Sequence, residues 1–357
     1  MIVFLVLCGG ASVSAQEYEA QSETLFQWFK GWREYMLTSD MDSGYIDIPQ
    51  QPWLASINFD VGGHLHGLNI PFDFGSSQAT FTSGIYNKVS LGAYYRGWGL
   101  SYGHSITNSN ATQFTFTSSG QTLGIDFTYQ SSNSMRCVIT NCDADGNITA
   151  QKLLEQEEGN GRFSVLDINA YYVFNSRRFS YSAALGQSAM QMQDAGSFFL
   201  GMTYYQTILN ISGSLLAQEM MSKRCEVATR QIALGLGYGY NHVSPDKRFL
   251  MHGSAMPMLM VPIYNSFHTS PLLDGSIEWN DETQQSYNML HDELQRYTDH
   301  PQLSMLGVIR AAIYWNVTPL WVVGVTGLLT IYPSFYSQRF STYSMQWSSF
   351  AYVGYRF

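Results

Sequence analysis

The feature that most constrains the fold is a repeated alternation of apolar and polar residues along most of the chain. In residues 89–95 the apolar Val89, Leu91 and Tyr95 alternate with Ser90 and Gly92. Successive side chains of a β-strand point to opposite faces, so this period of two indicates strands with one apolar face. The same pattern recurs in residues 98–102, 123–129, 166–174 and 232–240. Strands of this kind, with lipid on one side and an enclosed interior on the other, are typical of transmembrane β-barrels.

Composition favours strands over membrane-spanning helices. Only 13% of the 357 residues are charged and 15% are aromatic, whereas water-soluble domains usually carry about 25% charged residues. The mean hydropathy of −0.11 is nevertheless low for a helical membrane protein. The longest nearly apolar stretch, residues 319–332, is shorter than the ~20 residues that a spanning helix needs. Alternation accounts for both properties, because a lipid-facing strand needs an apolar residue only at every second position.

The last strand of the sequence has the same pattern. Ala351, Val353, Tyr355 and Phe357 form an apolar face, and Arg356 lies on the other. We expect this strand to close the barrel against the first one, to face outer-membrane lipid, and to be read by the barrel-assembly machinery through the terminal Phe357.

Connection lengths predict the topology. Short connections near residues 96–97, 118–121, 175–177, 244–247 and 316–319 alternate with long ones near 71–85, 131–162, 210–229, 264–302 and 333–344. The alternation is consistent only if residues 178–209 cross the membrane once, so we expect residues 198–208 to cross and residues 187–196 to fold into or under the lumen. The expected fold is all-β, an antiparallel up-and-down barrel of about twelve strands. Short turns belong in the periplasm, which predicts a bacterial outer-membrane location with both termini periplasmic.

The N-terminal region divides into two segments before the barrel of residues 53–357. Residues 1–15 have an apolar core followed by small residues, as in a secretory signal peptide. Residues 16–52 form a periplasmic segment with an expected amphipathic helix. A capping box of Thr24 and Gln27 opens that helix, and its apolar stripe contains Leu25, Trp28, Phe29, Trp32, Tyr35 and Met36.

Four segments resemble an uncharacterised family of outer-membrane barrels, the domain of unknown function 4421. They are residues 178–201 (RFSYSAALGQSAMQMQDAGSFFLG), 42–46 (DSGYI), 95–100 (YRGWGL) and 235–240 (GLGYGY). The resemblance spans roughly residues 40–357 and implies a Gram-negative outer-membrane barrel, without an activity or catalytic residues. The sequence departs from the family at residues 190–194, where basic residues are more usual.

Polar residues in phase with the inner face are the candidate functional residues. We interpret them either as an internal salt-bridge network or as the lining of a binding or conducting lumen, because buried charges need partners. They are Asp60, His64, His66, Lys88, Arg96, Asp126, Asp167, Arg310 and Arg356.

Three further motifs suggest chemistry and have simpler interpretations. His64 and His66 share a strand face, as two metal ligands would, but two histidines alone are ordinary lumen residues and no metal is expected. His104 lies near Ser101 and Ser105, as in a lipid-boundary Ser-His site, but no third orienting residue can be named. Residues 141–148 (NCDADGNI) resemble part of a calcium loop, but Lys152 stands where a bidentate acid belongs, which favours a plain turn.

The cysteines leave two alternatives open. Cys137 and Cys142 either form a disulfide in an oxidising compartment or remain free thiols, with Cys225 unpaired.

We therefore expect a monomeric, porin-like outer-membrane barrel that binds or passes a small hydrophilic or amphipathic solute. The alternatives are a lipid-modifying enzyme, for which no catalytic residues are named, and a structural or surface-interaction barrel without catalysis. No cofactor is expected, and the net charge of −9 does not favour a nucleic-acid partner.

Overall fold

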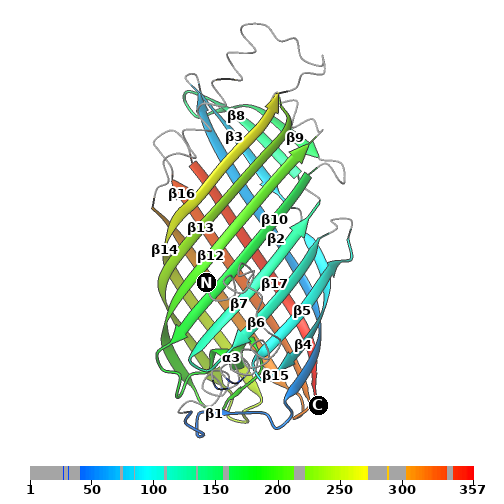
Figure 1. Ribbon diagram of the computed structural model, residues 1–357, viewed down its shortest axis with the longest axis vertical. Coiled ribbons are helices and arrows are strands. Elements are labelled where there is room, and N and C mark those ends of the chain that lie inside the picture. Colours follow the sequence, from blue (N-terminus) through cyan, green and yellow to red (C-terminus); the bar gives the residue numbers. More distant parts are fainter. Residues whose placement is uncertain are drawn as a thin grey trace, which may run out of the picture.

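The protein is an antiparallel β-barrel of twelve strands in a computed structural model (Figure 1). The structure describes residues 27, 31, 41–72, 75–83, 85–107, 111–133, 136–155, 161–212, 222–271, 288, 303–335 and 341–357. The barrel strands are β2 (Trp53–Phe72), β4 (Tyr86–Tyr95), β5 (Trp98–Ser105), β6 (Thr112–Ser119), β7 (Leu123–Ser132), β10 (Gly161–Val173), β12 (Ala195–Ser212), β13 (Ser222–Val243), β14 (Phe249–Pro271), β15 (Ser304–Asn316), β16 (Trp321–Phe335) and β17 (Ser341–Arg356). The expected signal peptide (1–15) and the helix expected around residues 24–36 lie outside the described residues, apart from Gln27 and Gly31.

Pairing between the first and last barrel strands closes the cylinder. β17 pairs antiparallel with β2 from Arg356↔Leu54 to Ser341↔Asn69. Trp53 and Phe357 exchange both backbone hydrogen bonds beyond that register. Every wall strand therefore has two neighbours, which removes the unpaired edges that a membrane does not tolerate. We call the end of the barrel where β2 begins and β17 ends the terminal end, and the opposite one the loop end.

The two faces of the wall differ as the alternation predicts. Along β2, Ile57, Phe59 and Val61 are exposed on the outside, and Ser56, Asn58 and Asp60 are buried inside. β13 presents Ile232, Leu234, Leu236, Tyr238 and Tyr240 outward. Aromatic rings cluster outside the terminal end, where Trp321 lies 4.9 Å from Tyr355 between ring centroids, and Trp53 lies 4.6 Å from Tyr95. An apolar belt with an aromatic border on a closed barrel is the pattern of a transmembrane barrel of outer-membrane type. No helix among the described residues has the length and apolar character to cross a membrane.

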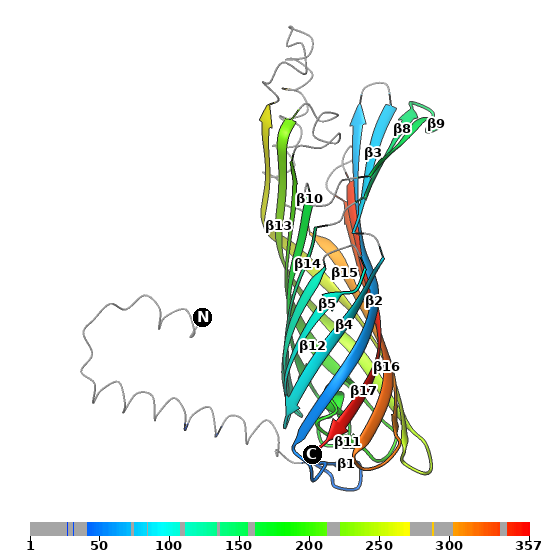
Figure 2. The same cartoon turned by 90° about the vertical axis from the view of Figure 1, so that its right-hand side faces the viewer.

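Two connections that the sequence analysis treated as loops contain strands. β3 (Gly75–Thr82), β8 (Arg136–Asp143) and β9 (Ile148–Glu155) continue the sheet past the loop end, because β2 pairs with β4 along its first half and with β3 along its second. Figure 2 shows this extension splayed away from the barrel axis. β13 and β14 are also longer than expected and pair along residues 222–271. The apolar residues of β3, β8 and β9 do not follow a sustained period of two, so the sequence pattern did not distinguish these strands from loops.

The connection between β10 and β12 folds back into the barrel at the terminal end. We call this connection, residues 174–194, the plug. It contains the short helix α3 (Tyr181–Leu185) and the strand β11 (Met190–Gln191). Ser180 caps α3 by accepting a hydrogen bond from the Ala183 N–H. The leading segment, residues 41–52, lies against the plug, and its strand β1 (Ile46–Asp47) pairs with β11 (Figure 1).

The plug corrects one boundary of the sequence-based topology. The single crossing of residues 178–209 is confirmed, but the crossing strand begins at Ala195, earlier than the expected residue 198. The inserted segment also begins well before residue 187. Phe179, Ser180 and Ala184 are completely buried, and no period-two alternation marks them because they belong to a turn and a helix.

Candidate functional site

The lumen is the candidate site, and most of the residues predicted to face it do so. Asp60, His64, Lys88, Asp167 and Arg356 are buried inside the barrel. The side chains of Arg310 and Asp126 are 15% and 16% exposed and form an ion pair, and His66 is half-buried beside His64.

Arg96 is the exception, because it lies exposed at the terminal end. With Gly97 it forms the two-residue turn between β4 and β5, in which both residues have positive φ (44° and 87°). This geometry is that of a type I′ hairpin turn, whose tip points past the last paired residues. The guanidinium of Arg96 lies 5.8 Å from the ring centroid of Tyr95. Alternation assigns a face only within a paired strand, so the expectation for Arg96 was wrong.

Arg310 on β15 is the centre of a charged cluster in the lumen. Its Nη1 donates to Asp126 Oδ2 at 3.3 Å across the barrel. Asp167 on β10 accepts a hydrogen bond of 2.9 Å from the amide of Asn169, the residue that pairs with Asp126 in the wall. The guanidinium also lies 6.0 Å from the ring centroid of Tyr181 on α3. The charge of Arg310 is thus in contact with both the wall and the plug.

A second polar cluster lies on β2 and β4. Ser90 donates to the carboxylate of Asp60, and Lys88 donates to Gln113 on β6. The ammonium of Lys88 also lies 4.1 Å from the ring centroid of Tyr86. Asp60 and Lys88 face each other in the β2–β4 register. These contacts distribute one negative and one positive charge over neutral partners, which limits the cost of their burial.

The two histidines lie together closer to the loop end, in a small apolar pocket with Phe81, Phe163 and Leu209. The ring centroid of His64 is 5.1 Å from that of Phe163. Within the described residues no group of three or more His, Cys, Asp or Glu side chains is arranged to hold a metal ion. The pocket therefore combines aromatic rings with the two imidazoles and the hydroxyl groups of Thr82 and Ser83.

Below the charged cluster, the plug fills the terminal end of the lumen. Phe179 and Tyr181 of the plug pack together with Tyr171, Val173 and Phe199 of the wall. The ring centroids of Tyr171 and Tyr181 are 4.7 Å apart in an edge-to-face arrangement. On the other side of the plug, Ala183 and Ala184 pack against apolar residues of the leading segment and the wall, namely Ile46, Leu54, Val243, Leu250, Ala312, Tyr314, Val322 and Tyr352.

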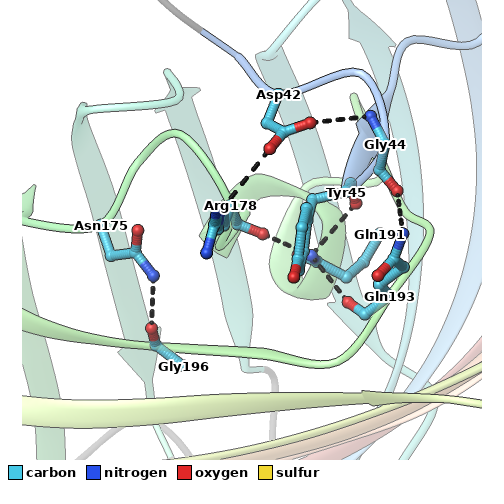
Figure 3. Close-up of polar contacts among 8 residues, drawn as sticks. All are labelled: Asp42, Gly44, Tyr45, Asn175, Arg178, Gln191, Gln193 and Gly196. Carbon is cyan, nitrogen blue, oxygen red and sulfur yellow. Dashed lines mark hydrogen bonds and ion pairs between the residues drawn. The ribbon is translucent and has the colours of Figure 1, made fainter.

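Gln191 organises the polar contacts of the plug. Its Oε1 accepts from the Ser180 N–H at 2.8 Å and from Asn241 Nδ2 at 3.0 Å. Its Nε2 donates to the carbonyl oxygens of Tyr45, Arg178 and Gln193 at 3.2, 2.6 and 3.0 Å. One buried amide therefore joins the plug to itself, to β13 and to the leading segment. Figure 3 shows its bonds to the carbonyl oxygens of Tyr45, Arg178 and Gln193.

Wall residues hold the plug at two further points. Gln121, in the turn before β7, donates to the carbonyl oxygens of Ser176 and Phe179 at 2.7 and 3.0 Å. Asn241 Nδ2 also donates to the Ser180 carbonyl at 2.9 Å. Buried amides of this kind satisfy backbone groups that the turn leaves unpaired.

Charged side chains connect the surface of the plug to the leading segment and to β13. Arg178 lies 3.7 Å from Asp42 and 4.9 Å from the ring centroid of Tyr45, both in the leading segment (Figure 3). At the other end of the plug, Asp194 accepts from the Val243 N–H at 2.7 Å and contacts His242 Nδ1 at 2.8 Å. The Val243 N–H, with the bond to His242, lowers the pKa of Asp194 below its ordinary value.

Comparison with known proteins identifies the family. Residues 42–357 match the family described as "Domain of unknown function (DUF4421)".

The chain belongs to this family.

Solved structures resemble the DUF4421 barrel only at low identity. The outer-membrane protease OmpT from Escherichia coli is 9% identical, with a TM-score of 0.41 and coverage of 87% of this chain and 97% of that one. The translocator domain of the autotransporter NalP from Neisseria meningitidis is 11% identical, with a TM-score of 0.30 and coverage of 97% and 100%. The β-domain of the Bordetella autotransporter BrkA is 10% identical, with a TM-score of 0.34 and coverage of 86% and 100%. Comparison with curated proteins gives no match.

The Ser-His motif does not form a site in the DUF4421 barrel. His104 is exposed on the outside of β5, whereas Ser105 is buried inside, where its Oγ contacts Asn87 and Thr107. Ser101 has the same parity as Ser105 and the opposite parity to His104, so the wall separates the serines from the imidazole.

The calcium-like motif is the turn between β8 and β9. Asp143 Oδ1 accepts from the backbone N–H groups of Asp145 and Asn147 at 3.0 and 2.8 Å, and Gly146 has a φ of +83°. These bonds, led by that of Asn147, lower the pKa of Asp143. The carboxylate that would be a metal ligand is occupied by its own turn.

Cys142 is a free thiol. It shares β8 with Cys137 five positions away, and an extended strand separates such Cα atoms by roughly 16 Å. A disulfide needs a separation of about 4.4–6.8 Å, so the two cysteines cannot form one.

The residues that hold the plug carry no clear signal in the sequence. Gln121, Tyr181, Gln191 and Asn241 were not singled out because neutral amides and a tyrosine carry no charge pattern. The available signal was the N-cap Ser180 inside a stretch without alternation, directly after a completed strand.

Proposed function

We propose that this DUF4421 barrel binds a small hydrophilic or amphipathic solute in its lumen and passes it across the outer membrane only when the plug moves. The single observation that carries the proposal is the contact of Arg310 with both Asp126 of the wall and Tyr181 of the plug. A solute that engages the guanidinium changes the forces on Tyr181, so binding and plug position are coupled through one side chain.

The proposal places the terminal end in the periplasm. Apart from the plug, its turns are short, with two residues between β4 and β5 and a few at 244–248 and 317–320. Outer-membrane barrels put short turns on the periplasmic side and long loops outside. The plug would then close the periplasmic mouth, and a solute would enter from the loop end.

The packing of the plug favours a gated barrel over an open pore. Ile46, Phe179 and Tyr181 are 3%, 0% and 4% exposed. Burial of each such side chain stabilises the closed state by about 1.5–3 kcal/mol. Exposing all three thus costs roughly 5–9 kcal/mol before any hydrogen bond of Gln191 is broken, so spontaneous opening is rare.

Conductance across planar lipid bilayers in potassium chloride tests the proposal. The wild type is expected to be silent, and a variant in which a short Gly-Ser turn replaces residues 176–194 is expected to conduct. A matched control lacks residues 136–155, which lie outside the barrel, and should remain silent. A heat-dependent shift in gel mobility shows that each variant is a folded barrel. Silence of a folded plug-less variant would refute a conducting lumen.

The sheet extension favours a second function, surface interaction without catalysis. β9 is the outer strand of the β2–β3–β8–β9 sheet, and its far edge has no strand partner among the described residues. An open edge can pair with an added strand of another protein. Loss of binding to cells or matrix in the variant lacking residues 136–155, with plug-dependent conductance unchanged, would assign the role to this edge; unchanged binding would exclude it.

A further inference from the structure

A small cavity at the terminal end is lined by two arginines and by no acidic residue. It lies between the start of β2, the β4–β5 turn and the plug, and its polar lining includes Arg96, Gln187, Ser188 and Arg356. Its free volume is about 20 Å³. That volume accommodates one water-sized group or a small ion.

Arg356 is buried in this cavity without a negative partner. It is 1% exposed, and its Nη1 donates to Asn316 Oδ1 at 3.0 Å, while its Nη2 donates to Gln187 Oε1 at 3.3 Å. Both partners are neutral amides. Its Nε is buried and has no hydrogen-bond partner within the described chain.

Within the residues that the structure describes, Arg356 lacks the carboxylate partner that Arg310 has. Arg310 is also inside the barrel, but it has Asp126 at 3.3 Å. Burial of an arginine is tolerated when a carboxylate or another anion compensates its charge. In the part of the chain that the structure describes, no carboxylate lies within ion-pair distance of Arg356.

We propose that the cavity binds a halide-sized monovalent anion, chloride in the cell, between Arg356 and Arg96. The anion supplies the negative charge that the lining lacks and accepts the unpaired Nε–H. Arg96 contributes the second positive charge from the β4–β5 turn. Its placement at a hairpin tip, outside the lumen proper, is what brings it to the cavity.

The anion joins the wall to the plug, which deepens the proposed gating and rests on it. Gln187 belongs to the plug and already accepts from Arg356, and Ser188 lines the same cavity. An anion bound here is enclosed only while the plug is seated. It therefore stabilises the closed state by mass action, and displacing the plug releases it.

Chloride binding to the detergent-solubilised full chain is measured by broadening of the chloride NMR line. The wild type is expected to give saturable broadening of the chloride line. Added bromide should reduce this broadening by competition, whereas gluconate, which is too large for the cavity, should leave it unchanged. Arg356→Gln should abolish the saturable component. Arg248→Gln, an exposed arginine at the same end outside the cavity, is the matched control and should leave it unchanged.

A second variant protects the test against misfolding, because Arg356 is next to the last residue of the closing strand. Arg96 is exposed in a turn, so Arg96→Gln should fold normally. It is expected to weaken chloride binding about tenfold, which corresponds to about 1.4 kcal/mol. Absence of saturable broadening in the folded wild type, or equal chloride affinity in the wild type and Arg96→Gln, would overturn the proposal. Neither readout depends on conductance, so its failure is distinct from failure of the gating proposal.

Discussion

Replacing Arg310 tests whether the lumen centre is a dry, paired charge cluster. The Arg310–Asp126 distance of 3.3 Å gives a Coulomb attraction of about 5 kcal/mol at an effective dielectric constant of about 20, part of which offsets desolvation. Arg310→Met removes the only cation of the cluster and leaves Asp126 and Asp167 without compensation. Breaking a buried pair in this way costs about 3–5 kcal/mol of unfolding free energy.

Replacing Asp126 should lower the free energy of unfolding less than replacing Arg310 does. Asp126→Asn leaves Arg310 with Asp167, which is also buried nearby, so we expect a loss of only about 1–2 kcal/mol, near the cost of an impaired buried hydrogen bond. The double variant Arg310→Met/Asp126→Asn should be more stable than Arg310→Met alone, because it carries one uncompensated carboxylate instead of two. The sign of this difference is the sharpest part of the prediction.

Equilibrium unfolding in urea, followed by tryptophan fluorescence in detergent, measures these differences through a double-mutant cycle. A coupling free energy of about 2 kcal/mol or more is expected. Strictly additive effects, or an Arg310→Met variant as stable as the wild type, would refute the reasoning and indicate that water screens the pair.

Three further outcomes follow from the contacts around the plug. Gln191→Ala leaves the Ser180 N–H and Asn241 without their acceptor, at about 1–3 kcal/mol for each unsatisfied group, so brief conductance openings should become at least tenfold more frequent. Gln193→Ala removes only an exposed bond to the Gly44 carbonyl oxygen and should change their frequency much less. Because the pKa of Asp194 is lowered, its stabilising effect is present above the ordinary value of 3.8 and is lost as the pH falls through the lower folded value. The difference in unfolding free energy between the wild type and Asp194→Asn, measured in urea, should thus be constant near neutral pH and shrink below pH 3.8. A difference that stays constant down to pH ~2 would contradict this prediction. Cys142 should react with a maleimide in unreduced protein, and mass spectrometry showing it linked to Cys137 would contradict the strand geometry.

The wall of the barrel was predictable because lipid imposes one rule on every strand. The outward residues Leu91, Leu100 and Leu234 must be apolar wherever the chain crosses hydrocarbon, so the period of two survives along the whole wall. The same rule gave the correct faces of Asp60, Lys88 and Asp167. It failed at Arg96, where the chain leaves the paired region and parity has no meaning.

The plug was only partly predictable, for a different physical reason. Its residues are buried against other protein groups, and no external solvent imposes a period on them. Topology required an insertion in residues 187–196, but the position of Tyr181 and the role of Gln191 depend on contacts with Arg310, Asn241 and Tyr45 that are distant in sequence. The sheet extension escaped detection because β3, β8 and β9 show no sustained alternation of apolar and polar residues.

The attachment of the plug to the wall has a consequence for biogenesis. The plug connects β10 directly to β12, two neighbouring strands in the middle of the chain. The pairing of β2 with β17 instead joins the two barrel strands that are farthest apart in the sequence. Both ends of the plug are attached to neighbouring strands at the mouth that it closes, so its insertion requires no separate subunit. The residues that bind it lie next to β7 and on β13, and these strands are also neighbours of β10 and β12. The plug can therefore bind to them once these adjacent strands have paired, without waiting for the pairing of β2 with β17.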